Sequence, residues 1–227
     1  MRTRLLAPLV LTAALLAGCG GGSKSNGEAA KTAPQVVKDA VAAAGAAKGV
    51  HVSGSLVSGA DHLTLDLHID GGTGGTGTIT EQGLSFQFVR LGSKAYIKGS
   101  DAFYKKFAGA AAAQLLHDRW LMGSATTGQF ASLTGLTDIG QLIGHVLTTH
   151  DKLVNQGETT RNGQKVVAIH DVTKGGTLYV AATGEPYPLE VVKTGGAEPG
   201  DVTLGDWDKT TPVAAPKNPI DLSKLGG

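Results

Sequence analysis

The sequence predicts an α+β domain in which helices interrupt an antiparallel sheet. Residues 62–70 (HLTLDLHID) alternate strictly between apolar and polar side chains, which is typical of a strand with one wet face. An Asn-Gly pair at residues 162–163 separates two further strand-like segments, as in a β-hairpin. Residues 32–49 have the spacing of a helix. The predicted order of helix, strands, helices and strands is that of an α+β fold.

The first helix is expected to begin at Thr32 as N-cap, with Pro34 in its first turn, and to end before Gly49. Its apolar side chains recur at helical spacing: Val36, Val37, Ala40, Val41 and Ala44. One amphipathic helix that covers a sheet follows from this pattern.

Short strands with glycine-rich turns follow the first helix. In residues 62–70, the side chains of Leu63, Leu65, Leu67 and Ile69 point to one face. Further strands are expected near residues 77–81, in 84–90, where Leu84, Phe86 and Phe88 share a face, and in 94–99. This succession predicts an antiparallel meander.

The second half repeats the change from helix to strand. Two or three short helices are expected between Ser100 and His150. Strands 154–160 and 165–172 form the hairpin, residues from 177 onward form a strand, turn and strand, and residues 202–208 form a last strand. The final stretch, 211–227, contains three prolines and is expected to wrap the surface.

The N-terminus has the order of a secretory signal. Arg2 and Arg4 precede an uncharged apolar stretch over residues 5–16, which is too short to span a bilayer. Residues 16–19 (LAGC) resemble the lipobox of bacterial lipoproteins, in which the cysteine is acylated and becomes the mature N-terminus. We therefore predict a signal peptide over 1–18, a lipidated Cys19 with a flexible tether over 19–31, and one domain over 32–227.

Charge and cysteine content exclude several functions. The chain has 20 Lys+Arg and 19 Asp+Glu, and removing Arg2 and Arg4 leaves 18 against 19, a formal charge of −1. A near-neutral domain without a basic run is a poor nucleic-acid binder. Cys19 is the only cysteine, so no disulfide forms within the chain.

The sequence offers little catalytic chemistry. His62, Asp66, His68 and Asp70 share one face of a strand, which is a metal-ligand pattern but equally the solvated face of an amphipathic strand. The glycine-rich residues 71–77 lack the lysine of a phosphate-binding loop. We predict no catalytic residues, no metal and no cofactor, and hence a protein that is not an enzyme.

Three stretches resemble the LppX/LprG group of actinobacterial envelope lipoproteins, which have the fold of the carrier LolA. They are residues 94–99 (KAYIKG) leading into 101–106 (DAFYKK), residues 178–186 (LYVAATGEP), and residues 205–208 (GDWD) with Pro212. The resemblance implies a strongly curved antiparallel sheet (a half-barrel) with the N-terminal helix and the inserted helices on its concave side. It also implies an apolar space between sheet and helices that receives the acyl chains of lipids or glycolipids.

The apolar strand faces are compatible with such a cavity, although ordinary core packing is the alternative for each of these side chains. The cavity candidates are Leu63, Leu65, Leu67, Ile69, Leu84, Phe86, Phe88 and Ile97. The expected function is lipid trafficking by a monomer anchored at the extracytoplasmic face of the cell membrane through Cys19, with an envelope transport protein as a further partner. The alternative is a lipid-anchored scaffold or interaction module with a filled core and no ligand.

Overall fold

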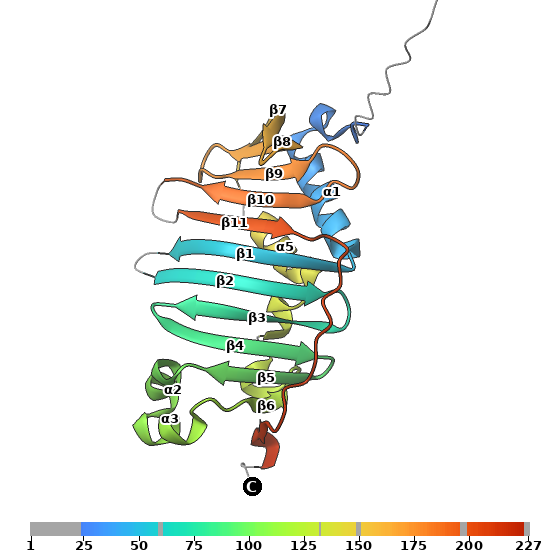
Figure 1. Ribbon diagram of the computed structural model, residues 1–227. Coiled ribbons are helices and arrows are strands. Elements are labelled where there is room, and N and C mark those ends of the chain that lie inside the picture. The colour runs from blue at the N-terminus through green and yellow to red at the C-terminus, as the bar shows by residue number, and fades with distance from the viewer. Residues whose placement is uncertain (1–23, 59–60, 132, 149–150, 196–198, 225–227) are drawn as a thin grey trace, which may run out of the picture.

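The computed structural model describes residues 24–58, 61–131, 133–148, 151–195 and 199–224. Its main feature is one twelve-stranded curved sheet that does not close into a barrel, with the strand order β12-β6-β5-β4-β3-β2-β1-β11-β10-β9-β8-β7 (Figure 1). All neighbouring strands are antiparallel except β12 and β6. The predicted α+β class is confirmed.

The strands divide into two blocks of the chain, separated by helices. Their bounds are β1 Gly49–Ser58, β2 Asp61–Asp70, β3 Gly74–Glu81, β4 Leu84–Leu91, β5 Lys94–Gly99, β6 Leu121–Ser124, β7 Leu153–Arg161, β8 Gln164–Asp171, β9 Thr177–Ala181, β10 Pro188–Lys193, β11 Gly200–Gly205 and β12 Ile220–Asp221. The predicted meander is present as β2 to β5. Strand β6, within the stretch expected to be helical, was not predicted.

The helices lie before, within and after the sheet. Their bounds are α1 Ala33–Ala46, α2 Asp101–Ala108, α3 Ala110–Leu116, α4 Leu133–Leu136 and α5 Ile139–Thr148, with 3-10 turns at Glu28–Ala30, Gly128–Phe130 and Leu222–Lys224. Helices α1 and α5 lie behind the sheet in Figure 1, and α2 and α3 lie beyond one end of β4 and β5. We call the face of the sheet on the side of α1 and α5 the covered face. The opposite face, which is toward the viewer in Figure 1, is the open face.

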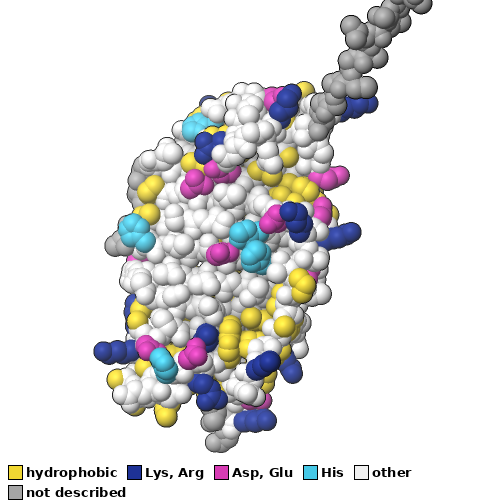
Figure 2. Space-filling model, in the orientation of Figure 1, with side chains coloured by type: hydrophobic (Ala, Val, Ile, Leu, Met, Phe, Trp, Pro, Cys, Tyr) yellow, Lys and Arg dark blue, Asp and Glu magenta, His cyan; other side chains and the backbone are white. Residues whose placement is uncertain are grey.

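Strand register sorts the side chains onto these two faces. Val52, Leu67, Gly77 and Phe88 are direct partners in successive strands and therefore share the covered face. The next residues along each strand are on the open face, which is mostly white in Figure 2, that is, backbone and side chains that are neither hydrophobic nor charged. The alternation predicted for residues 62–70 is thus the alternation between core and solvent.

Helix α1 forms where the sequence predicted it. The Thr32 N–H donates to Gln35 Oε1 at 3.0 Å, and Pro34 occupies the first turn, where its missing N–H costs nothing. The helix buries Val36, Ala40 and Ala44 against the sheet. A fully buried valine such as Val36 contributes about 1.5–3 kcal/mol to folding.

The predicted hairpin at Asn162 and Gly163 is confirmed. Both residues have positive φ (50° and 77°), which a two-residue turn of this kind needs and which Asn and Gly tolerate best. The turn joins β7 to β8 from Arg161 opposite Gln164 to Glu158 opposite Val167, beyond which the register shifts.

The flexible tether predicted through Lys31 is wrong for its described part. Ser25 bridges to Thr183, and the Asn26 side-chain amide donates to the carbonyls of Ala181 and Gly184. Glu28 is buried and paired with Lys31 at 2.7 Å. Backbone and polar side-chain contacts therefore fix this segment without the large apolar residues whose absence suggested a tether. The earlier residues, Cys19 included, lie outside the described residues.

The C-terminal segment wraps the surface, as predicted. After β11 it runs along the ends of the strands to the other end of the sheet, where β12 pairs in parallel with β6 (Figure 1). The Asp208 N–H donates to the Gly49 carbonyl, and Asp208 Oδ1 accepts from the Lys48 N–H at 3.0 Å. In the part of the chain that the structure describes, no helix is long and apolar enough to span a membrane.

Candidate functional site

The eight cavity candidates all project from the covered face, but they divide into two groups. Leu67, Ile69 and Phe88 are fully buried, Phe88 with no exposed surface. They belong to the same core cluster as Ile143 of α5 and Val36 of α1. Their packing is that of a filled core.

The other five candidates are only half-buried. We call them the apolar shelf: Leu63, Leu65, Leu84, Phe86 and Ile97. They come from β2, β4 and β5, and the register places Leu65, Ile79 and Phe86 side by side across three strands. The shelf thus continues the covered face beyond the fully packed core.

Helix α2 borders the shelf through its aromatic residues. The Phe103 ring lies 5.4 Å from that of Phe86, and the Phe107 ring lies 4.8 Å from that of Phe103 (centroid distances). A Cβ at Gly99 would lie 2.4 Å from Phe103 Cδ1, so glycine at this position permits the close approach of the helix. The Tyr104 hydroxyl accepts from the Gly99 N–H at 2.9 Å and donates to the Arg119 carbonyl, which fixes α2 to the sheet.

Between the shelf and α2 runs a groove of about 360 Å³, near the lower end of the range for small-molecule sites. Its lining combines apolar and charged side chains: Leu84, Phe86, Phe103 and Phe107 with Asp61, Glu81, Gln82 and Lys106. Phe107 is 66% exposed, which is unusual for a phenylalanine. An apolar lining with charges beside it suits an amphiphile.

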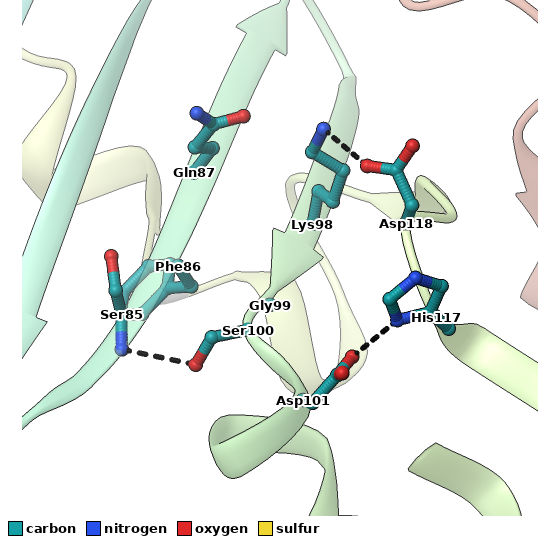
Figure 3. Close-up of a pocket in the computed structure, with 9 residues that line it drawn as sticks. All are labelled: Ser85, Phe86, Gln87, Lys98, Gly99, Ser100, Asp101, His117 and Asp118. Atoms are coloured by element: carbon teal, nitrogen blue, oxygen red, sulfur yellow. Dashed lines mark hydrogen bonds and ion pairs between the residues drawn. The ribbon is translucent and has the colours of Figure 1, made fainter. Parts of the chain in front are cut away.

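A second pocket, of about 450 Å³, lies at the corner between β4, β5 and the start of α2 (Figure 3). Lys98 is paired with Asp118 at 2.9 Å, and His117 Nδ1 lies 2.8 Å from Asp101 Oδ1. Asp101 raises the pKa of His117, while Lys98 lowers the pKa of Asp118. Each cation here has its own carboxylate, and polar groups dominate the lining, so this pocket does not suit an acyl chain.

The four residues considered as metal ligands, His62, Asp66, His68 and Asp70, do not all lie together in the structure. The structure brings Asp66 and His68 together with His51 of β1. His62 and Asp70, at the two ends of β2, are not in this group. Cys19, the predicted lipidation site, is outside the described residues.

Comparison with known proteins adds the fold. No known family profile matches the chain, and no curated protein matches its sequence. Among solved structures, LprF from Mycobacterium bovis is similar at 14% identity over 86% of this chain and 99% of LprF, with a TM-score of 0.50. The lipoprotein LppX from Mycobacterium tuberculosis matches at 17% identity over 80% of this chain and 99% of LppX (TM-score 0.49).

The chain has the LprF fold. This confirms, at the level of the fold, the resemblance to the LppX/LprG group that the three sequence stretches indicated. A LolA superfamily protein from Nitrosomonas europaea also matches, at 9% identity over 81% of this chain and 96% of that protein (TM-score 0.29).

Sequence reasoning missed the two phenylalanines of α2. Phe103 and Phe107 are four residues apart, and this spacing places them on one side of a helix. That signal was present in the sequence. What the sequence did not show is that this side meets Phe86 across the end of the sheet.

Proposed function

We propose that this protein is a lipoprotein, anchored in the membrane through Cys19, that binds the acyl chain of a lipid or glycolipid along its apolar shelf. Its role would be trafficking of that lipid in the cell envelope, at the extracytoplasmic face of the membrane. The observation that carries the proposal is the groove between Phe86, Phe103 and Phe107, where aromatic and aliphatic side chains of a folded domain remain open to solvent.

Shielding is sufficient as a mechanism, and no covalent step is required. Each methylene group that becomes fully buried against the shelf contributes about 0.8 kcal/mol. The charged groups beside the groove, Asp61, Glu81 and Lys106, would stay hydrated next to the polar head of the ligand. Similarity to LprF supports the fold on which this proposal rests.

The structure changes which residues test the proposal. Leu67 and Phe88 fill the core, so substitutions there would destabilise the domain whether or not it binds a ligand. Leu65 is a better position because it is half-buried on the shelf. Thr64 is its matched control, since the neighbouring residue of the same strand points to the open face.

The test uses a soluble form that begins at Lys24, which keeps the contacts of Ser25 and Asn26. Mass spectrometry of the gently purified protein should find about one bound lipid per chain. Leu65→Lys should lose this lipid and the uptake of a fluorescent fatty acid, whereas Thr64→Lys should keep both. A wild-type protein that carries no lipid and takes up no probe would refute the proposal.

The second candidate is a lipid-anchored scaffold or interaction module. The burial of Leu67, Ile69 and Phe88 favours it, because these three side chains belong to one packed core cluster with Ile143 of α5. The same experiment separates the two functions, since a scaffold predicts that Leu65→Lys changes neither lipid content nor probe uptake.

A further inference from the structure

The centre of the open face holds a group of side chains that lipid binding does not use. His51 of β1 and His68 of β2 are direct partners in the strand register. Their rings are stacked, with centroids 4.2 Å apart and planes within 7°. Asp66, two residues before His68 on the same face, completes the group. Figure 2 shows histidine side chains together near the middle of this face, beside acidic ones.

Both imidazoles direct the same nitrogen toward one carboxylate oxygen. His51 Nε2 lies 2.8 Å from Asp66 Oδ1, and His68 Nε2 lies 3.9 Å from that atom. A zinc ion with four ligands at about 2.0–2.2 Å requires neighbouring ligand atoms roughly 3.3 Å apart. The two distances bracket this value, and the three ligand atoms all lie within 4.8 Å of one another, so side-chain rotations would bring all three onto one ion.

The surroundings leave an ion accessible. All three side chains are partly exposed, and Gly205, which has no side chain, is the partner of His51 on the other flank. Asp206 follows directly, and its pKa is lowered mainly by Lys209 and to a smaller extent by His51 and His68. The Asp206 carboxylate is itself paired with Lys209 Nζ at 2.6 Å, so Asp66 is the acidic ligand of the group.

We propose that His51, His68 and Asp66 form a binding site for a divalent transition-metal ion of the zinc class. Two imidazoles and one carboxylate suit zinc, nickel or copper, whereas magnesium and calcium prefer oxygen ligands alone. Three protein ligands leave a fourth position for water or for a group from outside the chain. This revises the expectation of no metal, which considered β2 alone and did not include His51.

The site is independent of the lipid proposal, because it lies on the opposite face of the sheet from the shelf. A metal here would link β1 to β2 across the register. Loss of lipid in Leu65→Lys should therefore leave metal binding unchanged, and removal of the metal should leave lipid content unchanged.

The test is a zinc titration, by isothermal calorimetry, of the full chain purified in detergent, without a histidine tag and after treatment with a chelator. We expect one zinc ion per chain. His51→Ala and His68→Ala should each weaken binding by about tenfold or more, and millimolar magnesium should not compete. His62→Ala is the control, since His62 is an exposed histidine of the same strand and face.

The site would be overturned by a wild-type chain that binds no zinc, or by a His51→Ala or His68→Ala variant that binds as tightly as the wild type. Circular dichroism would show that His51→Ala and His68→Ala keep the sheet. If one of the two fails to fold, the other still tests the proposal. A loss of affinity in His62→Ala equal to that in His68→Ala would also contradict it, because the affinity would then belong to exposed histidines in general.

Discussion

Phe86 and Phe88 lie two residues apart on one face of β4, yet their environments differ. Phe88 is fully buried in the core cluster, and Phe86 is half-exposed beside α2. The strand pattern is the same at both positions, so the difference comes from how far the helices extend over the sheet. The covered face therefore has a packed part that provides stability and an open part that is available for a ligand.

The two phenylalanines give the largest contrast in stability. Phe88→Ala leaves a cavity in a closed core and should lower the free energy of unfolding by about 4 kcal/mol. Phe86→Ala removes a ring that already contacts solvent and should cost about 1 kcal/mol. Urea unfolding of both variants measures the difference. Equal losses would show that the shelf is as closed as the core.

Gly77 tests the packed part without removing any side chain. A Cβ there would lie 2.5 Å from the Asp66 carbonyl oxygen and 2.7 Å from Leu67 Cδ2, so Gly77→Ala should destabilise the domain by about 2–3 kcal/mol in urea unfolding. Gly45 in α1 is the control because its Cβ would meet nothing within 4 Å. Gly45→Ala should stabilise by about 0.5–1 kcal/mol, and a loss there instead would contradict this reading of α1.

Acid should weaken the part of the sheet near α1 through Asp171. The backbone N–H groups of Thr173, Lys174 and Asp151 hold the pKa of this buried carboxyl below its usual value, with Lys174 the main cause. A lowered folded-state pKa gives stability that is present above about pH 4 and is lost as the pH falls through the folded value. Asp171→Asn should cost about 2 kcal/mol at pH 7.

The pH dependence of chemical unfolding checks this prediction, because the gap between wild type and Asp171→Asn should narrow below about pH 4. Glu81→Gln, at the exposed edge of the groove, serves as the control and should leave stability within about 0.5 kcal/mol. A gap that stays constant down to pH 2 would show that the charge of Asp171 is not what stabilises the turn after β8.

The smallest effect on stability is expected at Phe107. Because its ring is mostly exposed, Phe107→Ser should change stability by less than about 0.5 kcal/mol while lowering the uptake of a fluorescent fatty acid. Leu115 of α3 is 78% exposed and does not line the groove, so Leu115→Ser should be equally mild and leave uptake unchanged. Equal uptake of the fatty acid by Phe107→Ser and Leu115→Ser would show that Phe107 does not take part in binding the ligand.

Local pattern was enough to predict most of the fold. Alternation identified β2, turn chemistry identified the hairpin at Asn162 and Gly163, and capping residues identified α1. These features are set by nearest neighbours in the chain. Residues 24–31 were misjudged because their stability comes from hydrogen bonds to β9 and the turn that follows it, which composition does not reveal.

The candidate sites were harder to predict because they depend on contacts between distant segments. Alternation placed the cavity candidates of residues 62–70 on one face and those of 84–90 on one face, but it could not separate Phe86 from Phe88, since this requires knowing which part of the sheet the helices cover. The partner of His68 is His51, seventeen positions earlier in the chain, and only the register of β1 against β2 makes them neighbours. A single sequence contains no direct signal for that register.

The order of the strands sets the distance between the N-terminal segment and the apolar shelf. The described chain enters the fold beside β9, where Ser25 meets Thr183, whereas the shelf reaches β4 and β5. Six strand spacings separate β9 from β4, a distance of about 30 Å. If Cys19 holds the chain to a membrane, the apolar shelf lies far along the sheet from the segment that leads to this anchor.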